Sequence, residues 1–332
     1  MYLLLLTISF IRNESIDGDL TRFIFPILFI PFVFLANKYD KNDFDFFHYV
    51  FIAMSAILFV LTFAKLLINA SSLNSNSNYI YYINELIWLE RPYMGFFLHL
   101  GLLSSLFLFD KKNKFLYIIY AIAILLFNII IASKLAVLLN LLAITIFVFR
   151  KRTMLGIYFL LFFIALIVLI LNTGLGDGLR NRLHDFSKNE PRVIIWNSAS
   201  EVYREQGFNK AFGLSNGTYI QGKLDSINLA HRYELVDYYW VYDSHYNTHN
   251  QYLYFLLSYG LIGLLLIVLI SFYPFILAII HKDLYSVLVS GSFILFLLVE
   301  NIYSRQFGVF AFLILTSFIF VQIQHSRRGK EN

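Results

Sequence analysis

The sequence predicts an all-α integral membrane protein with about ten transmembrane helices and one large extracytoplasmic loop that contains short helices. Its 332 residues are 59% hydrophobic and only 14% charged, which is outside the usual range of soluble globular proteins. The apolar residues form long runs, and several runs reach the roughly 20 residues needed to cross about 30 Å of hydrocarbon. Runs such as residues 265–270 do not alternate as barrel strands would. The spans are therefore expected to be helices, which satisfy their own backbone in lipid.

The apolar runs divide the chain into three parts. A long hydrophilic stretch separates about seven of them from the last three. We therefore predict an N-terminal transmembrane bundle at residues 1–172, a large extracytoplasmic loop at 173–249, and C-terminal transmembrane helices with a cytoplasmic tail at 250–332. The first run is short and lacks the features of a secretory signal, so it is interpreted as a short or truncated span. The expected spans lie near residues 1–11, 22–37, 46–69, 93–109, 114–132, 134–149, 153–172, 250–279, 284–299 and 306–323.

Basic residues in the short connections predict the orientation. One set of connections and the C-terminal tail hold most of them, namely Lys38, Lys41, Lys111, Lys112, Lys114, Arg150, Lys151, Arg152, Lys282, Arg327, Arg328 and Lys330. The opposite short connections hold Arg12, Arg22, Arg91, Lys134 and Arg305. Because cytoplasmic loops are richer in Lys and Arg, both termini are expected in the cytoplasm and the long loop outside it.

Charge and cysteine content exclude two classes of site. The net charge of +5 could indicate a nucleic-acid partner, but most of the basic residues lie where membrane topology requires them. No nucleic-acid partner is therefore expected. The chain contains no cysteine, so neither a disulfide framework nor a thiolate metal site can form.

The long loop is expected to fold and to carry function. At some 75 residues it is longer than a connection between spans needs to be. Pro191 suits the first position of a helix, and Asn189 is a nearby capping candidate. Apolar residues then recur at helical spacing, at Val193, Trp196, Ala199, Val202 and Tyr203. One face of this helix is expected to pack on the bundle or to lie at the membrane surface.

The most informative segment is THNQYLYFLLSYGLIG at residues 248–263. It places His249 at the outer membrane interface, where a neutral imidazole can act as a general base, and Asn250 beside it can orient a hydroxyl or a sugar. Gly260 and Gly263 would allow another helix to approach closely. The structural alternative is that the polar pair caps the span and the glycines serve packing alone.

Basic residues on the predicted outer side form the second candidate feature. They run against the positive-inside bias, and Arg is suited to bidentate binding of phosphate oxygens, such as those of a pyrophosphate on a lipid carrier. The alternative is that the loop residues are ordinary solvated charges and that Arg305 pairs with Glu300. The residues are Arg180, Arg182, Arg192, Arg204 and Arg232 in the loop, with Lys134 and Arg305 at short turns.

A metal site is the weaker interpretation of the histidines near the end of the loop. Asp243, His245 and His249 lie close together in sequence, with His231 upstream. However, YDSHYNTHN has the composition of a loop, and no Glu follows the first His as zinc proteases require. We expect no metal and no cofactor.

Several of these patches together resemble the O-antigen polymerase and O-antigen ligase superfamily, bacterial membrane glycosyltransferases of surface polysaccharide assembly. HNQYLYFLLSYGLIG is similar to the family signature of His, then Asn, Ser or Gln, nine residues, and Gly-x-x-Gly. The family's Arg-x-x-x-Trp helix and glycine-containing turn are matched by Arg192, Trp196, Gly213 and Gly217. Further family patches are matched, in chain order, by ERPYMGFFL, IASKLAVLLNLL and ENIYSRQFGVF. Together the matched patches follow the family's order from about residue 90 to 323.

Two departures from the family pattern matter. Ser133-Lys134 replaces a Ser-Arg turn, which keeps the charge but loses the bidentate fork. The pattern before residue 90 is thin.

The resemblance implies a glycosyltransferase that uses a lipid-pyrophosphate-linked donor. A glycan on undecaprenyl pyrophosphate would be transferred, outside the cytoplasm, to the hydroxyl of an acceptor, without nucleotide sugar or metal. His249 would be the catalytic base or would position the hydroxyl. Substrate-binding residues would be Arg192, Lys134, Arg305, Arg182 and Asn250.

The favoured function is an O-antigen or capsular polysaccharide polymerase in the bacterial inner membrane. The alternatives are an O-antigen ligase, which moves the glycan to a lipid A core or a protein, a transporter of lipid-linked glycan, and a non-enzymatic membrane scaffold. The implied partners are an undecaprenyl pyrophosphate-linked oligosaccharide, membrane lipids and a chain-length regulator.

Overall fold

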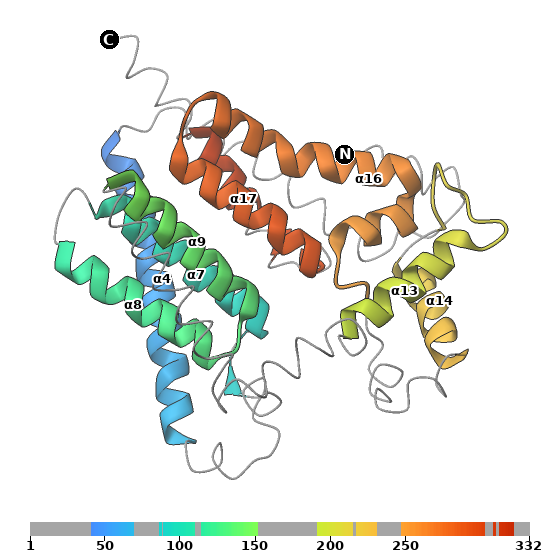
Figure 1. Ribbon diagram of the computed structural model, residues 1–332, viewed down its shortest axis with the longest axis horizontal. Helices are drawn as coiled ribbons and strands as arrows, with labels where there is room; N and C mark the ends of the chain where they lie inside the picture. Colours follow the sequence, from blue (N-terminus) through green and yellow to red (C-terminus); the bar gives the residue numbers. More distant parts are fainter. Residues whose placement is uncertain are drawn as a thin grey trace. The chain divides into compact units, whose positions relative to one another are not determined.

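The computed structural model describes residues 41–69, 86–87, 89–109, 114–151, 191–214, 217–230, 247–302, 308–309 and 312–321. All regular structure in these residues is helical, so the all-α prediction is confirmed for them. The expected spans at residues 1–11, 22–37 and 153–172 lie outside the described residues. The described helices, which are labelled in Figure 1, fall into two units.

The helices follow the predicted apolar runs closely. The first unit contains α4 (Lys41–Ile68), α7 (Arg91–Leu108), α8 (Lys114–Ile130) and α9 (Lys134–Lys151), together with the middle of α17 (Leu284–Val299). The second contains α13 (Pro191–Arg204), α14 (Gly217–Ala230), α16 (Gln251–Ile280) and both ends of α17. The helix at 312–321 also belongs to the second unit.

Two of the described helices are long and apolar enough to cross a membrane. They are Asp45–Ile68 within α4 and Gln251–Ile280, while Phe115–Ile130, Leu284–Val299 and Phe312–Val321 are apolar but shorter.

The first unit is a helix bundle whose interior holds both apolar and polar residues and whose outward side chains are largely apolar. α7 lies in its middle, and Leu98, Leu100 and Leu102 are almost fully buried. Along α4 the buried positions include His48, Ser55 and Thr62, seven residues apart and so on one face. The outward side chains of the bundle include Met54, Ile57, Leu61, Phe115, Leu116, Ile119, Ile122, Leu126, Leu138 and Leu142. A water-soluble bundle would carry polar side chains on its outside, so this apolar surface is suited to lipid.

A buried hydrogen-bonded chain links three helices of this bundle. His99 on α7 contacts the Oδ1 atom of Asn140 on α9 through Nδ1, at 2.7 Å. Its Nε2 atom contacts the Oγ atom of Ser292 on α17 at 2.8 Å. All three side chains are buried. In lipid such bonds contribute roughly 0.6–2 kcal/mol each to helix association, so the chain fixes which helix faces meet.

The second unit depends on a break in α16. Gly260 has φ 65° and ψ −158°, a combination that is essentially confined to glycine. The break separates Gln251–Tyr259 from a second part, residues 261–280, and the two parts run in different directions (Figure 1). At 1.5 Å per residue the second part is about 30 Å long, which matches the hydrocarbon thickness.

A turn at residues 209–214 fills the break. The backbone N–H of Leu214 donates to the Leu257 carbonyl at 2.8 Å, and the N–H of Leu261 donates to the Lys210 carbonyl at 2.8 Å. The N–H of Ile262 donates to the Ala211 carbonyl at 3.3 Å. These groups would otherwise pair within a continuous helix. We expected Gly260 to admit another helix, and this detail was wrong: the close neighbour of Gly260 is the backbone of a turn.

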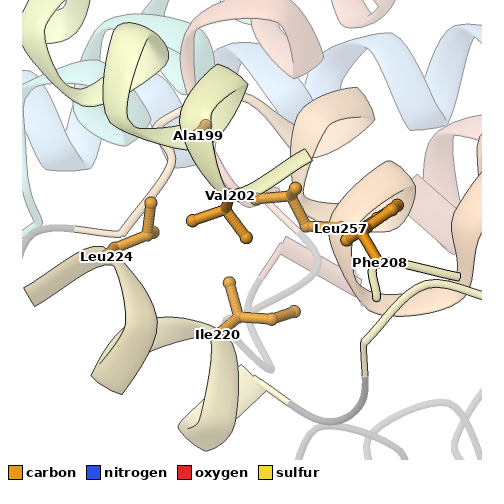
Figure 2. Packing of buried hydrophobic residues seen from close by; sticks show 6 residues of the cluster. All are labelled: Ala199, Val202, Phe208, Ile220, Leu224 and Leu257. Atoms are coloured by element: carbon orange, nitrogen blue, oxygen red, sulfur yellow. The ribbon is translucent and has the colours of Figure 1, made fainter. Parts of the chain in front are cut away.

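A small apolar core joins α13, α14 and the first part of α16. Figure 2 shows the six side chains converging from these helices and from Phe208, which directly precedes the turn. Beside it, Lys223 and Glu205 form an ion pair at 2.6 Å, and the hydrogen bond to Glu205 raises the pKa of Lys223. Exposed pairs contribute little to stability, so the apolar core holds these helices together. The core consists of Ala199, Val202, Phe208, Ile220, Leu224 and Leu257.

Replacing Gly260 by Ala is expected to destabilise the protein. A Cβ atom there would lie 2.5 Å from the Phe212 backbone nitrogen and would overlap the Ala211 carbonyl group, in a backbone conformation closed to alanine. We expect a loss of at least about 2 kcal/mol of unfolding free energy in mixed-micelle denaturation. Gly222→Ala is the matched control, because a Cβ on Gly222 meets nothing within 4 Å. The control should gain about 0.5–1 kcal/mol of unfolding free energy. Equal stability of the two variants would contradict the close packing of the turn on Gly260.

Candidate functional site

Glu300 brings together two segments that lie far apart in sequence. It directly follows α17, and its carboxyl group is buried, with 6% of the side chain exposed. The Oε1 atom accepts a hydrogen bond from Nη2 of Arg192 at 3.1 Å. The Oε2 atom lies 3.4 Å from Nδ1 of His249, which is long for a hydrogen bond. The two most strongly predicted site residues therefore meet on one buried carboxylate.

α13 presents Arg192 and Trp196 on one face. The helix begins at Pro191, as predicted, and proline suits this position because the first N–H of a helix has no partner within it. Arg192 and Trp196 are one helical turn apart. The indole Nε1 of Trp196 donates to the backbone carbonyl of Thr248 at 3.0 Å. The same helix face therefore contacts both Glu300 and the residue before His249.

The backbone around His249 is held in an uncommon conformation. His249 has φ 42°, in the left-handed region that side chains other than glycine rarely adopt. Its N–H donates to the Oδ1 atom of Asn247 at 2.9 Å. The hydroxyl of buried Thr248 donates to the Asn250 carbonyl at 3.0 Å and accepts from Nδ2 of Asn301 at 3.0 Å. Such strain costs about 1–3 kcal/mol and occurs often at functional sites.

Asn250 caps α16. Its Oδ1 atom accepts from the N–H groups of Tyr252 at 3.0 Å and Leu253 at 3.1 Å. A cap of this kind contributes about 1 kcal/mol. The amide oxygen of Asn250 therefore caps the span, as the structural alternative in the sequence analysis suggested. Substrate binding by Asn250 stays a prediction.

The remaining predicted residues are distributed as follows. Lys134 is the first residue of α9, in the first unit, and its side chain is exposed. Arg182 and Arg305 lie outside the described residues. Glu300, the alternative partner suggested for Arg305, contacts Arg192 and His249.

The metal interpretation gains no support from the described part of the chain. His231, Asp243 and His245 lie outside that part. Within it, no group of three His, Cys, Asp or Glu side chains is placed to bind a metal ion.

The sequence interpretation gave no site role to Glu300, Thr248 or Asn301. A signal existed for the first: Glu300 is the one acidic residue between Leu284 and Val321. A lone carboxyl group in an apolar stretch is costly to bury, and it commonly marks a functional or paired site. Thr248 and Asn301 carried no such signal, because their roles arise from backbone and amide contacts that no periodicity reveals.

The arrangement is suited to moving a proton beside an anion. A carboxylate at Nδ1 orients an imidazole, and the other ring nitrogen, Nε2, is then the atom that takes a proton from a substrate. A guanidinium has five N–H donors, so the bond from Arg192 to Glu300 is compatible with binding of phosphate oxygens. Arg192 and His249 are both partly exposed, with 34% and 24% of their side chains accessible.

Comparison with known proteins identifies one family. A family model described as O-antigen ligase matches residues 102–268, about half of the chain. The match runs from α7 into α16 and includes Arg192 and His249, but it ends before Glu300. No curated protein and no solved structure matches the chain.

Proposed function

Because the chain belongs to the O-antigen ligase family, we propose that it transfers a glycan from undecaprenyl pyrophosphate to the hydroxyl of a lipid-linked acceptor glycan on the extracytoplasmic side. Members of this family are integral membrane, glycosyltransferase-like enzymes, and the family implies lipid-linked polysaccharide substrates. The proposed activity is that of an O-antigen or capsular polysaccharide polymerase. A chain-length regulator is a further proposed partner.

The proposed topology places the site outside the cytoplasm. It has about ten spans in the bacterial inner membrane and both termini in the cytoplasm. The bundle covers residues 1–172, the loop 173–249 and the C-terminal helices 250–332. The lipid-suited surfaces of α4 and α16 support membrane insertion, and the distribution of Lys and Arg supports the orientation.

In the proposed mechanism His249 is the general base. The acceptor hydroxyl oxygen attacks the anomeric carbon of the donor sugar, and its proton passes to Nε2 of His249. The bond from that carbon to the pyrophosphate oxygen breaks, and undecaprenyl pyrophosphate leaves with the electron pair. Arg192, with Lys134, Arg182 and Arg305, is proposed to neutralise the leaving group. Glu300 positions the imidazole through Nδ1.

The single observation that carries this proposal is the shared contact of Arg192 and His249 with Glu300. A base and a phosphate-binding cation must lie on the two sides of one reacting carbon, so they have to be near each other before substrate arrives. One well-placed donor to a developing anion is worth roughly 3 kcal/mol. Glu300 supports such an arrangement because it holds both groups on one buried carboxylate.

His249→Ala is expected to abolish long-chain polysaccharide while the protein still inserts. General bases contribute typically 10²–10⁴-fold, so purified variant with lipid-linked repeat units should lose about that factor in product formation. His281→Ala, in the turn that follows α16, is the control and should retain wild-type activity. Wild-type chain length in the His249 variant would refute the assignment.

Glu300→Gln tests whether Glu300 acts through its two partners. The amide is uncharged and close in shape, so it removes the ion pair with Arg192 while the packing is preserved. We expect a loss of activity, and the double variant with His249→Ala should be no less active than His249→Ala alone, because residues that act as a unit are not additive. Additive losses in the double variant would place the effect of Glu300 elsewhere.

The type of glycan transfer can be tested in cells. Deleting the gene should leave single repeat units on the cell surface if the protein is a polymerase, which is the expected result. Complete loss of surface repeat units would identify a ligase. Formation of product chains by purified protein without nucleotide sugar would exclude the alternative of a transporter.

A further inference from the structure

The turn at residues 209–214 lies at one end of the apolar second part of α16. Its carbonyl groups at Lys210 and Ala211 accept hydrogen bonds from Leu261 and Ile262. These two residues begin the stretch that runs to Ile280. The turn is therefore within one hydrogen bond of the point where this apolar stretch starts.

The second part of α16 has the features of a complete membrane crossing. It contains 20 residues from Leu261 to Ile280, about 30 Å of helix. At its far end the polar turn His281–Asp283 follows directly. Its buried face is a narrow stripe, whereas the outward face is apolar and exposed at Leu261, Leu265, Leu269, Phe272, Tyr273, Ile276 and Ile279. If lipid covers this outward face, the bilayer boundary falls at about residue 261.

The turn is closed by its own hydrogen bonds and displays an aromatic residue. The Oδ1 atom of Asn209 accepts from the N–H groups of Ala211 at 3.1 Å and Phe212 at 3.2 Å. The Asn209 carbonyl accepts from Gly213 at 2.6 Å, and Gly213 has φ 75°. Phe212 in this turn is 41% exposed. Lys210 beside it is also exposed, and its Nζ atom lies 6.0 Å from the centroid of the Tyr203 ring.

We propose that residues 209–213 dock on the bilayer surface, with Phe212 in the interfacial layer and Lys210 directed to lipid phosphates. The occupant follows from continuity: the exposed face of α16 is apolar from Leu261 onward, and the turn that carries the exposed Phe212 is hydrogen-bonded to Leu261 and Ile262. An aromatic ring next to a basic side chain is typical of membrane-interface anchors. The turn follows α13 closely, so this contact also sets the height of the Arg192 helix above the membrane.

Site-directed spin labelling tests the depth of the turn, and the absence of cysteine makes the chain ready for it. Single variants Phe212→Cys, Leu261→Cys and Gln206→Cys carry a nitroxide in bilayers of phosphatidylethanolamine and phosphatidylglycerol. Gln206 is the water-exposed control, four residues before Lys210. Collision rates with oxygen and with a water-soluble nickel chelate report depth. The oxygen-to-nickel ratio at position 212 should be several-fold above that at 206 and close to that at 261.

A ratio at position 212 equal to that at 206 would overturn the proposal, because the turn would then lie in water. Ala211→Cys provides a second reading at an exposed position of the same turn, should the Phe212 variant fold poorly. Lys210→Glu in the labelled Phe212 variant should raise nickel accessibility, whereas Lys210→Arg should leave it unchanged. An unchanged value for both would remove Lys210 from the contact.

Discussion

The second unit, which contains the candidate site, depends on one constraint. This constraint is the set of backbone hydrogen bonds between the turn at residues 209–214 and the two parts of α16. Gly260 interrupts the helix, so Leu257 and Leu261 pair with the turn instead of with their own helix. The turn lies between α13 and α14, and the apolar core in Figure 2 packs both helices on the first part of α16. Arg192 at the start of α13 and His249 just before α16 therefore lie on helices that are joined by this turn and by the shared apolar core.

Glu300, at the end of α17, connects Arg192 and His249 through its carboxylate. A carboxylate buried without partners is unfavourable by several kcal/mol, so Glu300 requires the charge of Arg192 and the contact with His249. Those contacts in turn hold a partly exposed guanidinium and imidazole in place before any ligand binds. In terms of the proposed reaction, this preorganisation removes reorganisation from the chemical step.

The outward side chains of α4 and the buried core of α13 and α14 are suited to different surroundings. α4 buries His48, Ser55 and Thr62 beside Phe51 and Leu66 and turns apolar side chains outward, which suits a lipid environment. α13 and α14 instead contribute Ala199, Val202, Ile220 and Leu224 to a core of six buried residues, and four such residues are few for a unit that would fold by itself. Their attachment to α16 supplies the missing apolar partner through Leu257. The stability of the site helices is therefore coupled to a helix that is suited to the membrane.

The amino-acid sequence was enough to predict the helical class, the apolar runs, the helix that begins at Pro191, and the family signature around His249. Each of these depends on local composition, spacing or backbone preference, which the chain states directly. Three contacts could be seen only in the folded chain: a turn rather than a helix packs on Gly260, the side-chain oxygen of Asn250 caps α16, and Glu300 joins Arg192 to His249. Those contacts connect residues up to 108 positions apart, and no periodicity encodes them. They exist because buried charges and broken-helix backbone groups must find partners, and only the folded chain brings the partners within reach.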